Sequence, residues 1–209
     1  MDVVYGGGKY GKEAVEWLIK NGREFVVIDV DENCLVNREI NVEKFGGRFV
    51  RGEIQELLEI IEEVNPEYIF PTAPIHIAAS LISKKFDLEV WNEGVNYVLS
   101  GIPAKIIVSA GRGSVVVSYN RDYTCLPKCS APEVCPVTKI KKPAPMYSLL
   151  EFAIPEGFVI KTIYLRPGLG AIKGEEILEL FRWAEKRDKI LIATACRCHG
   201  VVTALKRRP

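Results

Sequence analysis

Five of the six cysteines in this 209-residue chain fall into two tight groups, and cysteine in such groups typically binds a metal. The first group follows the pattern C-x3-C-x5-C-P, and the second is C-x-C-H. Four thiolates suffice for a tetrahedral zinc ion or for a [4Fe–4S] cluster. The sequence therefore predicts a metal site at Cys125, Cys129, Cys135, Cys196 and Cys198, with His199 as a further candidate ligand.

The spacing of these cysteines leaves the nature of the site open. It matches neither the C-x2-C of zinc knuckles nor the C-x2-C-x2-C of ferredoxins, although Cys135-Pro136 is similar to the Cys-Pro that closes a bacterial ferredoxin motif. Abundant Glu, Lys and Ile with a single glutamine, Gln55, are typical of thermophiles, whose intracellular proteins can contain disulfides. An iron–sulfur cluster, zinc, one or two disulfides and unpartnered thiols remain as alternatives, while Cys34, outside both groups, is interpreted as a small buried hydrophobe.

A glycine-rich turn near the start of the chain predicts a second site. Gly6, Gly8 and Gly11 have the spacing G-x-G-x-x-G between an expected strand and an expected helix. These glycines allow a tight turn, the approach of a pyrophosphate to the backbone and close helix–strand packing, and the helix N-terminus presents free N–H groups to the anion. The alternative is a turn of the same shape that binds nothing.

An acidic residue about 20 positions after the turn supports a dinucleotide as the ligand. Asp29 ends the second expected strand, where its carboxylate could bind ribose hydroxyls, and Asp31 is the neighbouring alternative. No arginine directly follows that strand to receive a 2′-phosphate, which favours NAD over NADP. The predicted cofactor-binding residues are Gly6, Gly7, Gly8, Lys9, Tyr10, Gly11, Asp29, Asp31 and Thr72.

Strands and helices alternate in the first half of the chain. Apolar runs predict strands at 3–5, 25–30, 48–50, 68–70 and 88–91, and helical spacing predicts helices at 9–20, 54–64 and 75–84. Such alternation favours a doubly wound parallel sheet of the Rossmann type over residues 1–102. Thr72 and His76 follow the fourth strand and could line the nicotinamide side of its crevice, although His76 is more simply a partly buried histidine before a helix.

The pattern changes in the second half, which is expected to be a smaller α+β domain of residues 103–209. Glycines 111 and 113 predict an antiparallel hairpin between 105–110 and 114–119. A Pro-rich stretch, 120–147, carries three cysteines and needs a ligand or cross-link to hold it. A strand at 158–165, a helix at 175–186 and a last strand at 190–195 follow, and the last strand runs directly into the second cysteine group.

The first half also resembles a known family. The turn Gly6-x-Gly8-x-x-Gly11, the strand end Val27-Ile28-Asp29 and the segment Arg51-Gly52-Glu53 are similar to the TrkA-N family of nucleotide-binding domains. The resemblance extends from about residue 3 to about residue 82. It implies binding of NAD(H) or another adenine nucleotide, and it suggests a homodimer, since regulators of this type often dimerise.

Composition limits the remaining functions. Lysine plus arginine (28) nearly balances aspartate plus glutamate (27), so no nucleic-acid partner is expected. The apolar runs are too short to insert into a membrane, and the chain start has no secretory signal pattern, so a cytoplasmic location is expected. The sequence predicts an NAD(H)-binding redox protein with a cysteine-ligated metal. The corresponding enzyme class is an NAD-dependent oxidoreductase, and the sequence identifies neither its catalytic residues nor its substrate. The alternative is a nucleotide-sensing regulatory module with structural zinc or disulfides and no catalysis.

Overall fold

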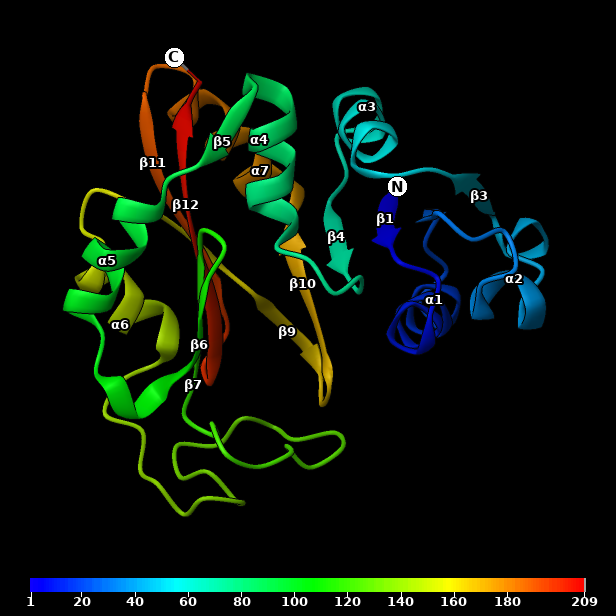
Figure 1. The fold of residues 1–209 in the computed structure, drawn as a ribbon. Coiled ribbons are helices and arrows are strands. Elements are labelled where there is room, and N and C mark those ends of the chain that lie inside the picture. Colours follow the sequence, from blue (N-terminus) through cyan, green and yellow to red (C-terminus); the bar gives the residue numbers. More distant parts are fainter. Residues whose placement is uncertain (209) are drawn as a thin grey trace.

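The computed structural model describes residues 1–208 and has a mixed α/β fold with two mixed sheets (Figure 1). The described residues form seven α-helices: α1 (Lys9–Lys20), α2 (Leu35–Glu39), α3 (Ile54–Val64), α4 (Ile77–Phe86), α5 (Asn92–Gly101), α6 (Met146–Ala153) and α7 (Gly174–Ala184). They also form the strands β1 (Asp2–Tyr5), β2 (Phe25–Asp29), β3 (Gly47–Arg51), β4 (Tyr68–Pro71), β5 (Leu88–Val90), β6 (Ile107–Gly111), β7 (Ser114–Ser118), β8 (Phe158–Lys161), β9 (Ile163–Arg166), β10 (Leu169–Lys173), β11 (Lys189–Ala195) and β12 (His199–Arg207).

The first sheet has the strand order β3-β2-β1-β4-β10-β9. Its four strands from the first half of the chain are mutually parallel, as the alternation of strands and helices predicts. The expectation of a wholly parallel sheet is not met, because β10 joins β4 in the antiparallel direction and β9 pairs antiparallel with β10. Strands from the second half of the chain therefore complete the sheet of the first half.

The second sheet has the order β6-β7-β12-β11-β8 and is antiparallel except for the pair β8–β11. The predicted hairpin around Gly111 and Gly113 is confirmed as β6 and β7. The prediction that the fifth strand joins the parallel sheet is wrong, because β5 pairs antiparallel with β12 in the second sheet. A strand of three residues has too short a hydrophobic pattern to indicate which sheet it joins.

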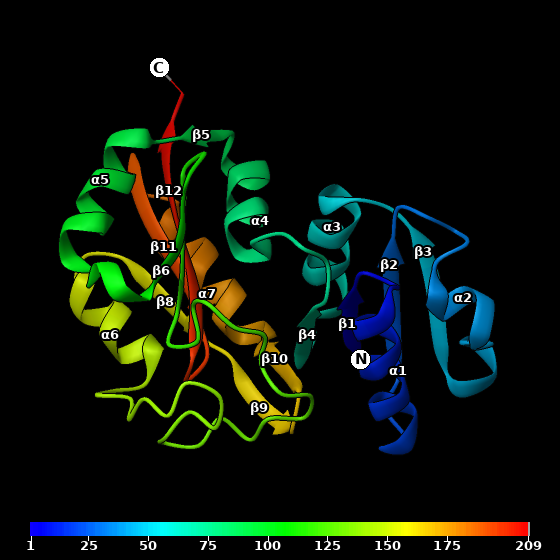
Figure 2. The same ribbon diagram turned by 60° about the horizontal axis from the view of Figure 1, so that its bottom comes forward.

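Helices pack on both sheets (Figure 2), and the buried apolar residues form three core regions. One core region joins α3, α4 and α7 to apolar residues of both sheets. A second lies between α1 and the outer face of the first sheet, and a third lies between α5, α6 and the second sheet. No helix within residues 1–208 combines the length and the apolar character needed to cross a membrane.

Variants in the turn between β1 and α1 can test how closely the helix packs on the strand. A Cβ on Gly11 would lie 1.9 Å from the carbonyl oxygen of Gly6, whereas a Cβ on Gly8 would meet no atom within 4 Å. We expect Gly11→Ala to lower the free energy of unfolding by about 2 kcal/mol or more, because the backbone must move to relieve the overlap. The control Gly8→Ala, at the helix N-cap, should cost no more than about 1 kcal/mol. Urea denaturation measures both, and equal losses would contradict the packing argument.

Candidate metal centre and glycine-rich turn

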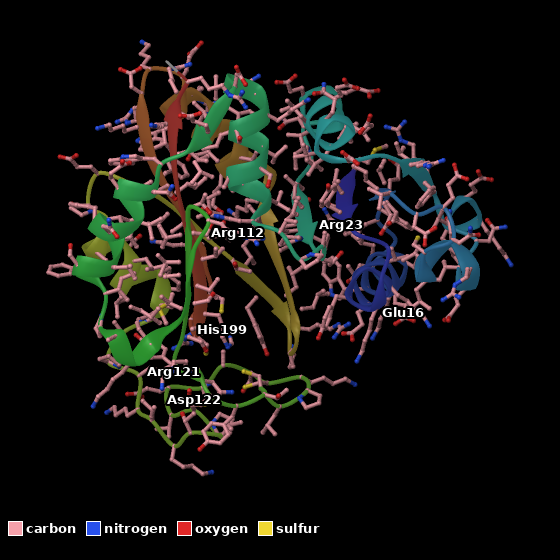
Figure 3. All side chains as sticks on the ribbon, viewed as in Figure 1. Glu16, Arg23, Arg112, Arg121, Asp122 and His199 are labelled. Carbon is pink, nitrogen blue, oxygen red and sulfur yellow. The ribbon has the colours of Figure 1, made fainter. Side chains whose placement is uncertain are left out.

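The cysteine-rich loop after β7 is fastened at both ends to the turn that carries the second cysteine group. The backbone N–H of Tyr119 donates to the carbonyl oxygen of Cys198 (3.1 Å), and that of Met146 donates to the carbonyl oxygen of Arg197 (3.1 Å). The Tyr119 hydroxyl also donates to the carbonyl oxygen of Ala144 (2.8 Å). Two cysteine groups about sixty residues apart in sequence therefore meet at one end of the second sheet. Figure 3 labels His199, which follows the second group, at this end of the sheet.

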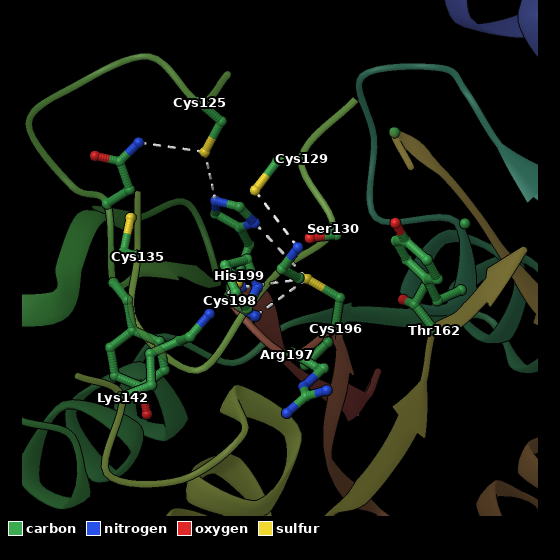
Figure 4. A pocket seen from close by; sticks show the side chains of 18 of the residues that line it. Cys125, Cys129, Ser130, Cys135, Lys142, Thr162, Cys196, Arg197, Cys198 and His199 are labelled. Carbon is green, nitrogen blue, oxygen red and sulfur yellow. Dashed lines mark hydrogen bonds between the residues drawn. The ribbon is translucent and has the colours of Figure 1, made fainter. Parts of the chain in front are cut away.

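The imidazole ring of His199 lies between one thiol from each group (Figure 4). Its Nε2 is 3.3 Å from Cys125 Sγ, and its Nδ1 is 3.7 Å from Cys196 Sγ. The hydrogen bond to Cys196 and the charges of both sulfurs raise the pKa of His199 to about 8. Although burial opposes ionisation of the Cys196 thiol, hydrogen bonds from His199 and from the backbone leave its pKa below the usual value. The site therefore favours negative sulfur.

Backbone N–H groups point at three of the sulfur atoms. Cys196 Sγ accepts hydrogen bonds from the N–H groups of Cys198 and His199, both at 3.3 Å. Cys129 Sγ accepts one from the N–H of Ala131, at 3.4 Å. The pKa of the Cys135 thiol is raised by burial, but hydrogen bonds from the Thr138 side chain and from backbone N–H groups outweigh that effect and leave it lowered. Such N–H···S contacts are typical of thiolates that bind a metal.

A buried lysine adds positive charge to the same site. Lys142 is only 7% exposed, and its Nζ donates to Cys198 Sγ at 3.1 Å. Burial is the main reason that the pKa of the Cys198 thiol is raised, and Lys142 partly offsets it. On the other side, Asn120 Nδ2 donates to Cys125 Sγ at 3.2 Å. An ammonium and an amide therefore face sulfur directly, and sequence reasoning missed both, because neither residue belongs to a recognisable motif.

These side chains line a largely apolar cavity of about 690 Å³, which we call the cysteine cavity. Its lining includes all five clustered cysteines, Lys142 and His199, and also Thr162, where the chain passes from β8 in the second sheet to β9 in the first. All six cysteines are free thiols. Within residues 1–208, no three His, Cys, Asp or Glu side chains already have a metal-binding arrangement, so ligation requires the thiols to rotate toward a common centre.

The glycine-rich turn is held by its predicted acidic partner. The N–H of Gly7 donates to Asp29 Oδ2 at 2.5 Å, and Asp29 Oδ1 accepts from the N–H of Asp31 at 2.8 Å. Gly6 has a φ of +110°, a conformation that favours glycine. The Thr72 hydroxyl donates toward the carbonyl oxygens of Tyr5 (3.0 Å) and Gly6 (2.7 Å), so it fastens the turn to β4.

Lys9 and Tyr10, two more of the predicted cofactor residues, lie at the exposed side of this turn. Tyr10 is 62% exposed, and the Nζ of Lys9 is 5.9 Å from the centre of its ring. The Asp31 carboxylate accepts a hydrogen bond from the N–H of Asn33 (2.8 Å). A pocket of about 370 Å³, here called the turn pocket, is lined by Tyr10, Glu13, Pro71, Thr72, Ala73, Pro74, Gly168, Leu169 and Gly170. The structure thus brings Gly6, Gly7, Asp29 and Thr72 together, whereas the Asp31 side chain binds the backbone of Asn33.

His76 does not line the turn pocket. Its Nδ1 is 2.7 Å from Thr203 Oγ1 and its Nε2 is 3.0 Å from Thr194 Oγ1, so the ring is bound to β12 and β11 of the second sheet. Burial lowers its pKa to about 3. No local signal in the sequence relates residue 76 to residues 194 and 203.

Comparison with known proteins places the chain in a family. Residues 1–77 match the model AF_1314_N, described as "Uncharacterized protein, N-terminal domain", and residues 78–208 match AF_1314_C, described as "Uncharacterized protein, C-terminal domain". A protein of Archaeoglobus fulgidus, described as "Uncharacterized protein", is 55% identical over 215 residues, covering 99% of this chain and 100% of the relative. The chain belongs to this two-domain family.

The resemblance to the TrkA-N family is wrong, because no model of that family matches and the two domain models together account for nearly the whole chain. General structural requirements of the turn explain the residues that suggested this resemblance. Gly11 allows the helix to pack on the strand, and Asp29 accepts the N–H of Gly7. Any strand–turn–helix unit of this shape needs such residues, so they do not identify one family.

The burial of His76 predicts how stability depends on pH. Because its folded-state pKa of about 3 is below the ordinary 6.5, the unfolded chain binds a proton first as the pH falls. We expect the free energy of unfolding to be unaffected by this group above pH 6.5 and to fall between 6.5 and 3, by up to about 1.4 kcal/mol per pH unit. Chemical denaturation across this range measures the slope. His76→Gln should lose this part of it, and the control His199→Gln should retain it; identical slopes in both variants would contradict the assignment.

Proposed function

We propose that this protein is an NAD(H)-binding redox protein whose cysteine cavity holds a metal centre, with an iron–sulfur cluster as the metal and zinc as the alternative. The observation that carries the proposal is the convergence of five cysteines from two distant segments on one cavity. Four of them are enough for either metal, and the fifth, with His199, leaves a choice of ligands.

The surroundings of the sulfurs support an anionic metal–thiolate centre. Backbone N–H groups donate to Cys129 and Cys196, and the Lys142 ammonium donates to Cys198. Hydrogen bonds and positive charge stabilise negative sulfur and raise the reduction potential of an iron–sulfur cluster. The apolar lining would limit water around the centre, which also tunes its potential.

The topology of the first sheet supports a dinucleotide as the second ligand. The parallel order β3-β2-β1-β4 matches the first four strands of the 3-2-1-4-5-6 order of a Rossmann-type sheet. Such sheets bind ligands where the strand order reverses, which here is between the carboxyl ends of β1 and β4. The turn pocket lies at this point, and open space surrounds Gly8, so a pyrophosphate could approach the N-terminus of α1.

The two candidate sites adjoin each other. Gly168, Leu169 and Gly170, in and beside the turn between β9 and β10, line both the turn pocket and the cysteine cavity. A dinucleotide bound with its pyrophosphate at Gly8 could therefore extend its nicotinamide toward the cavity. NADH supplies electrons in pairs, and a metal centre beside it could relay them one at a time to a one-electron acceptor outside this chain.

The metal proposal predicts the composition of the purified protein. Protein isolated without oxygen should contain iron and acid-labile sulfide and absorb visible light, since thiolate-bound iron–sulfur clusters are coloured. Cys135→Ser and Cys196→Ser should lose most of the metal, because each removes a sulfur that accepts backbone hydrogen bonds. The control Cys34→Ser, which lies beside the glycine turn, should retain it. If the protein contains zinc and no sulfide, zinc is the metal. If it contains neither iron nor zinc, the metal proposal is wrong.

The dinucleotide proposal predicts the effect of filling the space beside Gly8. Gly8→Trp should weaken NADH binding by at least about tenfold, which is about 1.4 kcal/mol, because the indole would occupy the approach to the helix N-terminus. The control Lys20→Trp adds the same side chain to the last turn of α1 and should bind normally. Calorimetric titration measures both affinities, and an unchanged affinity in Gly8→Trp would exclude the turn as the binding site.

A further inference from the structure

A row of four polar side chains crosses the face of the second sheet that α4 covers. It consists of Ser114 on β7, Thr203 on β12, His76 before α4 and Thr194 on β11, and we call it the hydroxyl–histidine row. Ser114 Oγ is 2.8 Å from Thr203 Oγ1, which is 2.7 Å from His76 Nδ1. His76 Nε2 is in turn 3.0 Å from Thr194 Oγ1. Each separation is that of a direct hydrogen bond, so the row is continuous.

The row connects two cavities. Ser114, Thr203 and His76 line a polar cleft of about 620 Å³ between α4 and β12, together with Ser80, Ser83 and Lys84. Thr194, at the other end, lines the cysteine cavity. The His76 ring therefore lies between a water-accessible cleft on one side and the candidate metal centre on the other.

Every member of the row can both donate and accept a hydrogen bond. A hydroxyl has one proton and two lone pairs, and a neutral imidazole has one donor nitrogen and one acceptor nitrogen. Burial lowers the pKa of His76 to about 3, so the ring stays neutral around neutral pH. The row can therefore reverse the direction of its hydrogen bonds without breaking any of its contacts.

We propose that the hydroxyl–histidine row conducts protons between the polar cleft and the cysteine cavity. A proton from cleft water passes to Thr203, directly or through Ser114, and the Thr203 hydroxyl gives its own proton to Nδ1 of His76. The ring releases the proton on Nε2 to Thr194, whose hydroxyl proton passes into the cavity. One proton enters and one leaves, and His76 changes from the Nε2–H to the Nδ1–H tautomer. Rotation of the hydroxyls and return of the ring to its first tautomer reset the row, and the reverse sequence carries a proton outward.

This inference rests on the proposed function, because that function requires a proton path. When NADH becomes NAD⁺, its two electrons would pass one at a time through the metal centre to a one-electron acceptor outside this chain, and the one proton of the transferred hydride would be released. A dinucleotide reaching toward the cavity would obstruct the direct route to solvent. The row reaches the cavity at Thr194, which does not line the turn pocket, so a ligand in the turn pocket does not cover it.

The first test needs neither metal nor dinucleotide. Exchange of the His76 ring N–H with deuterated solvent, followed by nitrogen-15 NMR, should be slower in Thr203→Val by roughly a hundredfold, the typical loss when a positioned proton donor is removed. Valine keeps the shape of threonine without its hydroxyl. The control Thr162→Val changes another threonine of the cysteine cavity that lies outside the row, and it should exchange at the normal rate. Equal exchange rates in Thr203→Val and the unaltered protein would overturn the inference, because protons would then reach the ring without the row.

The second test separates the inference from the proposed function. On rapid mixing of the metal-loaded protein with NADH, an indicator dye follows proton release and visible absorbance follows electron transfer. Thr194→Val should slow proton release by roughly a hundredfold without weakening NADH binding, and Thr162→Val should not. If the unaltered protein shows no NADH-dependent change in absorbance, the proposed function fails and the exchange experiment alone decides on the row. If electrons pass and protons appear equally fast in Thr194→Val, the row does not conduct them.

Discussion

The antiparallel pairing of β10 with β4 is the constraint on which the arrangement of both candidate sites depends. Ile172 pairs with Ile69 and Lys173 with Tyr68, and the N–H of Gly174 donates to the carbonyl oxygen of Glu67 at 3.0 Å. A Cβ on Gly174 would lie 1.8 Å from the carbonyl oxygen of Pro66, so close passage of the two segments requires glycine. This pairing places the turn between β9 and β10 over the carboxyl ends of β1 and β4. The turn pocket and the cysteine cavity share a wall for this reason.

The same crossing explains why a cavity exists beside the cysteines. The chain leaves the second sheet at Thr162, whose N–H still donates to the carbonyl oxygen of Ala195 at 2.9 Å, and continues into the first sheet as β9. Two sheets that diverge from one point cannot fill the space between them with strand side chains alone. The cysteine-rich loop covers that space, and its ends are fastened to residues 197 and 198. The loop therefore closes the cavity rather than forming an independent domain.

Local patterns predicted the elements whose partners lie nearby in the sequence. The helix at Lys9–Lys20 and the hairpin at Gly111 and Gly113 follow from periodicity and turn chemistry, and the structure confirms both. Grouping of the cysteines also predicted that the two sets could meet. Contacts across long separations were not predictable in this way. No pattern relates β10 to β4 or His76 to Thr203, since each pairing is chosen by packing of the whole chain.

The charge balance of the cysteine cavity bears on what it can contain. Several thiolates so close together repel one another, and Lys142 and Arg197 are the lysine and the arginine among the residues that line the cavity. Burial raises the pKa of Cys198, whereas hydrogen bonds lower those of Cys135 and Cys196, so the site is prepared to ionise some of its thiols. Five ionised thiols would exceed the positive charge that Lys142, Arg197 and His199 can supply, and would destabilise the loop that carries them. A bound metal would remove that repulsion and fasten the loop to the β11–β12 turn, so metal loading should contribute to the stability of this fold as well as to its chemistry.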